Sequence, residues 1–117
     1  MLKKEIKILI ADDHAQTATF VSGVLEFKGF KTFQAYNPKD TVSLCKKEKP
    51  DLLIFDMKME DMAGCKITHE LPNQKILFMV RSGEKAESCR NSIGTIEKPV
   101  DPTELVSKIK KEFKIED

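Results

Sequence analysis

Short runs of apolar residues, each followed by a polar turn, divide the chain into alternating segments. Residues 6–11, 52–55 and 76–80 are almost wholly apolar and show no alternation between polar and apolar side chains. Such runs are typical of strands covered on both faces, and parallel sheets in α/β proteins consist of such strands. We therefore expect at least three buried strands in one parallel sheet.

Between the first of these runs and the next strand, apolar residues recur at helical spacing. Ala18, Val21 and Leu25 lie on one face of a predicted helix over residues 15–28. Gly29 follows at the position where a left-handed residue ends many helices. This pattern predicts an amphipathic helix packed against the sheet.

Two further helices have clear start signals. Asn37 and Asp101 are residue types favoured at the N-cap, and each precedes a proline, which is favoured at the first helical position. We expect a helix over residues 38–47 and a last helix that begins at residue 102. The last helix should bury four residues, namely Leu105, Val106, Ile109 and Phe113.

The remaining segments predict shorter elements. Residues 31–36 and 95–97 are expected to form two more strands. Residues 65–71 have room for about two helical turns, and residues 84–92 contain few apolar side chains, so that helix should be short or poorly packed. The predicted fold class is α/β, with five parallel strands and helices on both faces of the sheet.

Length and charge narrow the function classes. The 117 residues predict a single domain over residues 1–117, with one core that needs no metal or disulfide. The net charge is +1, so nothing indicates binding to nucleic acid or to an anionic membrane. Neither a signal peptide nor a membrane span is visible, and we expect a cytoplasmic protein.

The cysteines do not predict a disulfide framework or a zinc site. Cys45, Cys65 and Cys89 are odd in number, widely spaced and without a Cys-x-x-Cys pair. We expect three reduced, structural cysteines.

Charged residues follow the predicted buried strands where each strand ends. Asp12 and Asp13 follow the first strand, Asp56 follows the third, and Lys98 follows the fifth. The carboxyl ends of parallel strands share one edge of the sheet, so these side chains should converge there. Three neighbouring carboxylates repel one another unless a hard divalent cation such as Mg²⁺ binds among them. We expect Asp13 and Asp56 to bind Mg²⁺, with Asp12 helping directly or through water.

A carboxylate beside Mg²⁺ and a lysine is suited to phosphoryl transfer. Asp56 would attack phosphorus, while Lys98 would stabilise the charge on the transferring oxygens. Taken singly, each residue has a simpler explanation, because Asp12 and Asp13 could cap the first helix and Lys98 could be a surface lysine. Their joint placement favours the functional interpretation.

At this point the chain resembles the receiver domain of two-component response regulators, of which the chemotaxis regulator is a minimal example. The resemblance covers nearly the whole chain. It depends on residues 8–13, on Asp56 followed by Met59 and Gly64, and on Lys98 before the last helix. It implies a flavodoxin-like, doubly wound sheet with strand order 2-1-3-4-5. The third and fourth helices, which the residues predict to be short, depart from the receiver pattern.

The resemblance also implies roles for particular residues. Asp56 would accept a phosphoryl group from a histidine kinase or phosphotransfer protein and would control a downstream protein partner. Asp12 and Asp13 would bind Mg²⁺ together with Asp56, and the main-chain carbonyl of Lys58 would complete the metal shell. Lys98 would contact the phosphoryl group. Such a chain is a phosphoacceptor that takes part in its own phosphorylation and dephosphorylation, rather than an enzyme.

Two switch positions depart from the receiver pattern. Val80 stands where receivers carry the threonine or serine that senses the phosphoryl group, and Thr95 stands where they carry an aromatic switch residue. Ser82 lies two residues beyond Val80, on the same face if the strand continues, and is an alternative source of the hydroxyl. These changes predict weakened coupling between the phosphoryl site and the rest of the domain.

Three other functions remain as alternatives. A pseudo-receiver would keep the fold as a protein-interaction module that works without phosphorylation, and the altered Val80 and Thr95 favour it. A flavodoxin-like cofactor binder would need a phosphate loop rich in hydroxyl and amide groups, where this chain has Asp12 and Asp13. An aspartyl phosphatase would carry a second acid two residues after Asp56.

Overall fold

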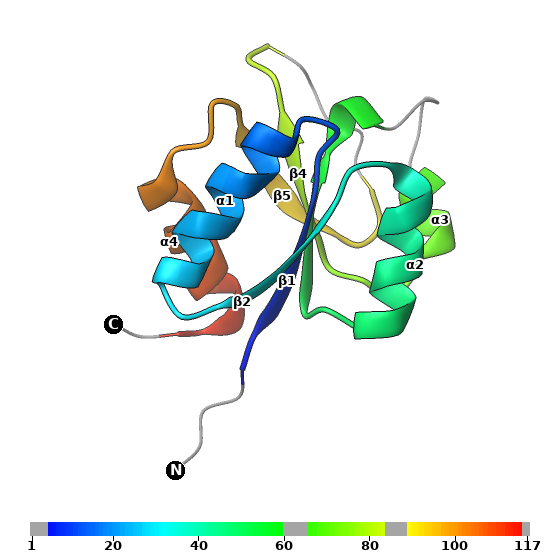
Figure 1. Ribbon diagram of the computed structural model, residues 1–117, viewed down its shortest axis with the longest axis horizontal. Helices are drawn as coiled ribbons and strands as arrows, with labels where there is room; N and C mark the ends of the chain where they lie inside the picture. The colour runs from blue at the N-terminus through cyan, green and yellow to red at the C-terminus, as the bar shows by residue number, and fades with distance from the viewer. Residues whose placement is uncertain (1–4, 60–65, 84–88, 116–117) are drawn as a thin grey trace.

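Five parallel strands form a single sheet in the order β2-β1-β3-β4-β5 (Figure 1). The computed structural model describes residues 5–59, 66–83 and 89–115. The strands are β1 Lys7–Ala11, β2 Lys31–Ala35, β3 Leu52–Asp56, β4 Ile76–Val80 and β5 Ser92–Glu97. The predicted fold class and strand order are confirmed.

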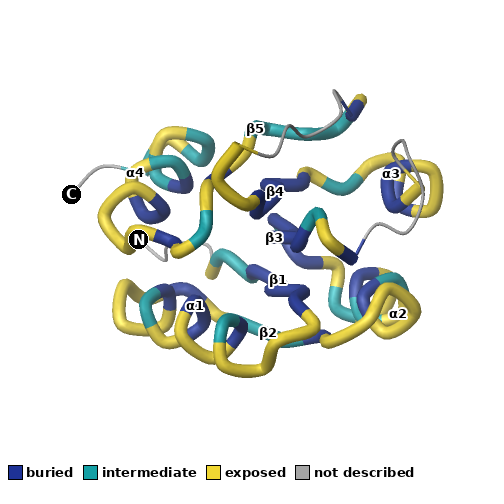
Figure 2. Tube along the Cα trace, turned by 90° about the horizontal axis from the view of Figure 1, so that it is seen from above, coloured by how far each residue is buried: buried dark blue, intermediate teal, exposed yellow. Residues whose placement is uncertain are grey.

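Helices cover both faces of this sheet. The described α-helices are α1 Ala15–Phe27, α2 Pro38–Glu48, α3 Lys66–Glu70 and α4 Pro102–Phe113, and a 3₁₀ turn, η1 Met57–Met59, follows β3. Figure 2 shows α1 and α4 together on one side of the strands, and α2 and α3 on the other side. The third helix is short, as predicted.

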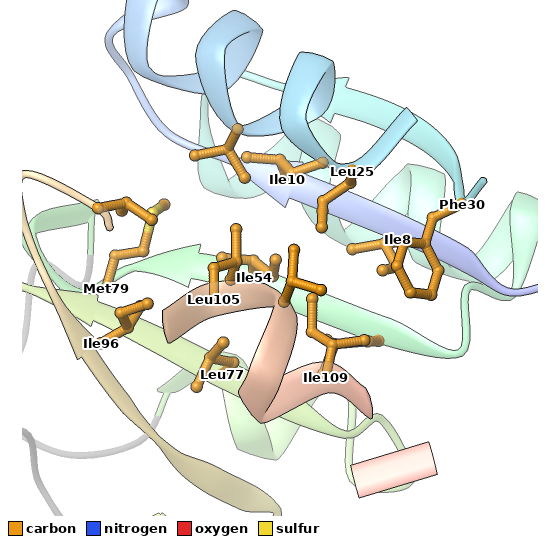
Figure 3. Packing of buried hydrophobic residues seen from close by; sticks show 14 of the residues in the cluster. Ile8, Ile10, Leu25, Phe30, Ile54, Leu77, Met79, Ile96, Leu105 and Ile109 are labelled. Carbon is orange, nitrogen blue, oxygen red and sulfur yellow. The ribbon is translucent and has the colours of Figure 1, made fainter. Parts of the chain in front are cut away.

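Each face of the sheet has its own core. Along β1, Ile8 and Ile10 belong to the cluster under α1 and α4, while Leu9 belongs to the cluster under α2 and α3. Figure 3 shows the first cluster, in which Leu25 of α1 and Leu105 of α4 are directed toward the side chains of the strands. Both faces are covered, which explains why the strand sequences do not alternate between polar and apolar residues.

The helix ends follow the predicted signals. Asn37 Oδ1 accepts a hydrogen bond of 2.8 Å from the main-chain N–H of Asp40, and Asp101 Oδ1 accepts one of 2.9 Å from that of Thr103. Gly29 has φ +95°, a left-handed conformation, just after α1. These bonds satisfy main-chain groups that a helix leaves unpaired at its ends.

The segment before β5 differs from the prediction. Residues 84–88 of the helix expected over 84–92 lie outside the described residues, while 89–91 are not helical and β5 begins at Ser92, three residues earlier than expected. Asn91 Nδ2 donates hydrogen bonds to the main-chain oxygens of Leu71 and Gln74, and this fixes the entry to β5. Gly94, at φ +136°, lies beside an irregularity in the β4–β5 register. A strand with such an irregularity is difficult to predict from its sequence pattern.

The cysteines also differ in part from the prediction. Cys45 of α2 is free and buried, and burial raises the pKa of its thiol to about 12. Cys89 is disulfide-bonded, so the expectation of a reduced thiol is wrong at this position. Cys65 lies outside the described residues. The spacing of cysteines in the sequence does not show which of them the fold brings together.

Within residues 5–59, 66–83 and 89–115, no helix is both long enough and apolar enough to span a membrane.

We predict that Leu105→Ala lowers the free energy of unfolding by about 2–5 kcal/mol, because the substitution leaves a cavity under α4 where Leu105 is fully buried. The exposed Ser107 on the same helix provides the matched control, and Ser107→Ala should change stability by less than about 0.5 kcal/mol. Urea unfolding followed by circular dichroism measures both. Equal stability of the two variants would contradict the packing described for α4.

Candidate functional site

Two buried carboxylates and one lysine meet at the carboxyl edge of the sheet. Asp12 directly follows β1, Asp56 ends β3, and Lys98 directly follows β5. Asp12 is 0% exposed and Asp56 3% exposed. The Nζ atom of Lys98 lies 2.6 Å from Asp12 Oδ2 and 3.2 Å from Asp56 Oδ2. The predicted convergence of these three residues is therefore what the structure contains.

The second oxygen of each carboxylate is held by the main chain. Asp12 Oδ1 accepts a hydrogen bond of 2.8 Å from the N–H of His14, and Asp56 Oδ1 accepts one of 3.1 Å from the N–H of Lys58. The two Oδ2 atoms accept no well-aligned hydrogen bond from any described residue, so their contact with the ammonium group of Lys98 is ionic. Both carboxylates are thus fixed by one oxygen and present the other toward Lys98.

Asp13 and His14 extend the cluster toward solvent. The side chain of Asp13 is 45% exposed, and its Oδ1 lies 3.0 Å from His14 Nδ1. One potential ligand atom from each of Asp12, Asp13, His14 and Asp56 lies within 4.8 Å of the others. His14 is not among the site residues predicted from the sequence. Its position directly after Asp13, at the strand end, was the available signal.

Burial and mutual repulsion set the charge states of the site. Burial raises the pKa of Asp56, the neighbouring Asp12 raises it further, and the Lys58 N–H and Lys98 only partly offset this. Burial lowers the pKa of Lys98, but its contacts with Asp12 and Asp56 outweigh this, and the net pKa is raised. Lys98 therefore stays protonated at neutral pH. The ionised form of Asp56 is less favourable than it would be in water.

The donor set fits a hard divalent cation. Asp12, Asp13 and Asp56 offer carboxylate oxygens within a few ångströms, and within the described part of the chain the ammonium group of Lys98 is paired with the two buried ones. Mg²⁺ prefers oxygen ligands and is commonly held by one or two carboxylates while it keeps several waters. The site therefore has the ligands and the excess negative charge that this ion requires.

The residues predicted to act as the switch lie in three different environments. Val80 is buried at the end of β4, and its main-chain oxygen accepts a hydrogen bond of 2.7 Å from the N–H of Lys98. Thr95 is exposed on β5 opposite Phe78. Ser82 is exposed in a turn after β4 has ended, so it does not continue the strand face on which its alternative role depended.

The sequence family agrees with this fold and site. Residues 8–110 match the family described as the response regulator receiver domain, and the chain belongs to that family. It is thus a receiver domain related to the response regulators of two-component phosphorelay signalling.

Two relatives differ in how much of their own length the chain covers. Sporulation initiation phosphotransferase F of Bacillus subtilis is 34% identical over 82 residues, which cover 67% of this chain and 66% of that protein. The phosphate regulon transcriptional regulatory protein PhoB of Pseudomonas aeruginosa is 26% identical over 113 residues, which cover 88% of this chain and 49% of that protein. The chain thus spans only about half of some of the regulators it matches.

Solved structures show the same architecture. A CheY-like receiver domain protein from Methanospirillum hungatei superposes with a TM-score of 0.78 at 27% identity, covering 93% of this chain and 94% of that one. The chemotaxis response regulator CheY4 of Vibrio cholerae has a TM-score of 0.76 at 20% identity, covering 92% of this chain and 98% of that one.

We predict that Asp56→Asn, measured with a metal chelator present, raises the free energy of unfolding at pH 7. The folded protein raises the pKa of Asp56, so ionisation of this carboxyl costs stability as the pH rises through that pKa. The gain should exceed the ±0.5 kcal/mol typical of surface substitutions and should shrink as the pH approaches the unfolded value of about 3.9.

Asp13→Asn is the matched control for this variant, because Asp13 belongs to the same cluster but is exposed. It should change stability less than Asp56→Asn does. Denaturant unfolding at several pH values measures both variants, and a stability difference for Asp56→Asn that does not vary with pH would contradict the electrostatics described here.

Proposed function

We propose that this receiver domain accepts a phosphoryl group on Asp56 from a phosphohistidine of a histidine kinase or phosphotransfer protein. The observation that carries the proposal is the approach of Lys98 Nζ to both Asp12 Oδ2 and Asp56 Oδ2, at 2.6 and 3.2 Å. An ion pair alone would explain one lysine and one acid. A buried pair of acids around one lysine, with a third acid at the rim, supports a site for a metal and a phosphoryl group.

The transfer exchanges one bond to phosphorus for another. An oxygen of Asp56 forms a bond to phosphorus as the bond between phosphorus and the imidazole nitrogen of the donor breaks. The imidazole keeps the electron pair and gains a proton from solvent. The ammonium group of Lys98 stays near the transferring oxygens and stabilises their negative charge.

Three acids of this chain would hold the magnesium ion. Asp13 and Asp56 would bind it, Asp12 would help directly or through water, and the main-chain carbonyl of Lys58 would complete the shell. The bound ion supplies positive charge that offsets the repulsion among the carboxylates and the phosphoryl oxygens. The hydrogen bond from the Lys58 N–H to Asp56 orients the carboxylate, and His14 holds Asp12 in the same way.

The signal would pass to a protein partner. We propose a cytoplasmic phosphoacceptor that takes part in its own phosphorylation and dephosphorylation, and that controls a downstream protein without contacting nucleic acid or membrane itself. The net charge of +1 supports this, because direct binding to nucleic acid usually requires a basic surface.

A pseudo-receiver that signals without phosphorylation is the second candidate. The observation that favours it is the exposed Thr95 on β5, where the related domains carry an aromatic switch residue. Without that ring, phosphorylation has no aromatic side chain to reposition at this place in the fold. The buried acids and Lys98 favour the phosphoacceptor, because a binding module has no need to keep carboxylates that repel each other.

We predict that Mg²⁺ raises the melting temperature of the parent protein and that Asp13→Asn removes most of this effect. A ligand that binds only the folded state stabilises it by about 2.7 kcal/mol at a concentration one hundred times its Kd. Asp40→Asn removes an exposed acid on α2, outside the site, and should keep the full effect. If Asp13→Asn and the parent respond equally to Mg²⁺, the metal site is elsewhere.

We predict that the purified protein gains the mass of one phosphoryl group from acetyl phosphate when Mg²⁺ is present. Asp56→Asn should abolish this gain, because Asp56 is the carboxylate that we propose attacks phosphorus beside Lys98. Asp40→Asn should be labelled like the parent. Intact-mass spectrometry measures all three proteins.

Three outcomes of this experiment separate the candidates. Labelling that depends on Asp56 supports the phosphoacceptor. Labelling that survives Asp56→Asn, or that maps to His14, contradicts it. A parent protein that stays unlabelled while it binds Mg²⁺ supports the pseudo-receiver.

A further inference from the structure

The register of the sheet gives Arg81 a place beside the phosphoryl site. Asp56, the last residue of β3, is paired with Met79 of β4, and Arg81 follows two residues later. In β4, Val80 is paired with Glu97 of β5, so the next step of the register sets Arg81 opposite Lys98. The hydrogen bond from the Lys98 N–H to the Val80 oxygen continues the ladder to this step. Arg81 therefore lies at the strand end between Asp56 and Lys98.

The direction of the side chains favours Arg81 over its neighbours. Ile76 and Phe78 pack under α2 and α3, whereas Leu77 and Met79 pack under α1 and α4. Side chains alternate along a strand. Val80 therefore faces the side covered by α2 and α3, and Arg81 faces the side covered by α1 and α4.

The reactive residues lie on the same side of the sheet as Arg81. Ile10, Ile54 and Ile96 all belong to the cluster under α1 and α4. Asp12, Asp56 and Lys98 each lie two residues after one of these positions, and alternation gives them the same side. By this alternation Arg81, rather than Val80, faces the side of the sheet that carries Asp56 and Lys98.

We propose that Arg81 is a second cationic contact for the phosphoryl group on Asp56, where its guanidinium group binds the phosphoryl oxygens alongside Lys98. The inference rests on the proposed phosphorylation of Asp56.

The chemistry of arginine suits this place. A guanidinium group is planar, is always charged and can donate two parallel hydrogen bonds to a phosphate, whereas a hydroxyl donates one. Neighbouring strands are about 4.8 Å apart, so Arg81 and Lys98 place two cations side by side. Lys98 already faces Asp12 and Asp56, and a dianionic phosphoryl group on Asp56 would add negative charge that a second cation can bind. Arg81 is exposed, so its long side chain can reach over the site from the rim.

Affinity for beryllofluoride, a phosphoryl mimic, tests the proposal. Isothermal titration calorimetry in saturating Mg²⁺ should show that Arg81→Ala binds the mimic about tenfold or more weakly than the parent, because hydrogen bonds to charged groups are strong. Arg81→Lys keeps the charge but not the forked geometry and should fall in between. The affinity of the parent should also fall more steeply with added KCl than that of Arg81→Ala.

Two matched controls accompany these variants. Arg90 is the other arginine of the chain and is exposed just before β5, at the opposite edge of the sheet, so Arg90→Ala should bind like the parent. Ser82→Ala removes the alternative hydroxyl and should also bind like the parent. Melting temperatures close to that of the parent show that the variants are folded.

The outcomes separate this inference from the function on which it rests. Affinities for Arg81→Ala within twofold of the parent would overturn the role of Arg81 and leave Asp56 as the acceptor. A loss of affinity in Ser82→Ala but not in Arg81→Ala would assign the contact to Ser82 and overturn it too. A parent protein that binds no beryllofluoride would overturn both the proposed function and this inference.

Discussion

The ion pairs that join Lys98 to Asp12 and Asp56 are the interaction on which the rest of the site depends. Two carboxylates that are almost fully buried repel each other, and each would be costly to keep ionised without a nearby cation. Lys98 comes from the far side of β4, which lies between β3 and β5, so its side chain joins three strand ends. Removing Lys98 would leave two buried carboxylates without their cation, which is strongly destabilising. The ammonium group thus offsets part of the repulsion, and the third acid, Asp13, leaves an excess of negative charge for a metal to neutralise.

Most of the fold could be predicted from local patterns in the sequence. Continuous apolar runs predicted β1, β3 and β4, and capping residues predicted the starts of α2 and α4, because those signals depend on a few neighbouring residues. The start of β5 was missed. Its first residues, Ser92 and Gly94, are uncommon in strands, and the strand forms because Asn91 and the adjacent β4 hold it in place. Tertiary contacts of this kind leave no periodic signal, and the disulfide at Cys89 is a further example.

Some features of the functional site could likewise be predicted from the sequence, and others could not. The positions of Asp12, Asp56 and Lys98 could be predicted because parallel strands deliver their carboxyl ends to one edge, whatever the side chains between them. What the sequence does not contain is the direction in which a residue near a strand end faces. A shift of one residue reverses that direction, and such a shift separates Val80, the switch position predicted from the sequence, from Arg81, the residue that we propose for this contact.

The central claim is that the acids and Lys98 form one site for a metal ion and a phosphoryl group on Asp56. A crystal structure of the protein with Mg²⁺ and beryllofluoride tests it most directly. Our account predicts the mimic bonded to an Asp56 oxygen, Mg²⁺ bound by Asp13 and Asp56, and the Nζ atom of Lys98 within hydrogen-bond distance of a fluorine. A metal bound away from these acids, or an unmodified Asp56 still paired with Lys98 at saturating ligand, would contradict it.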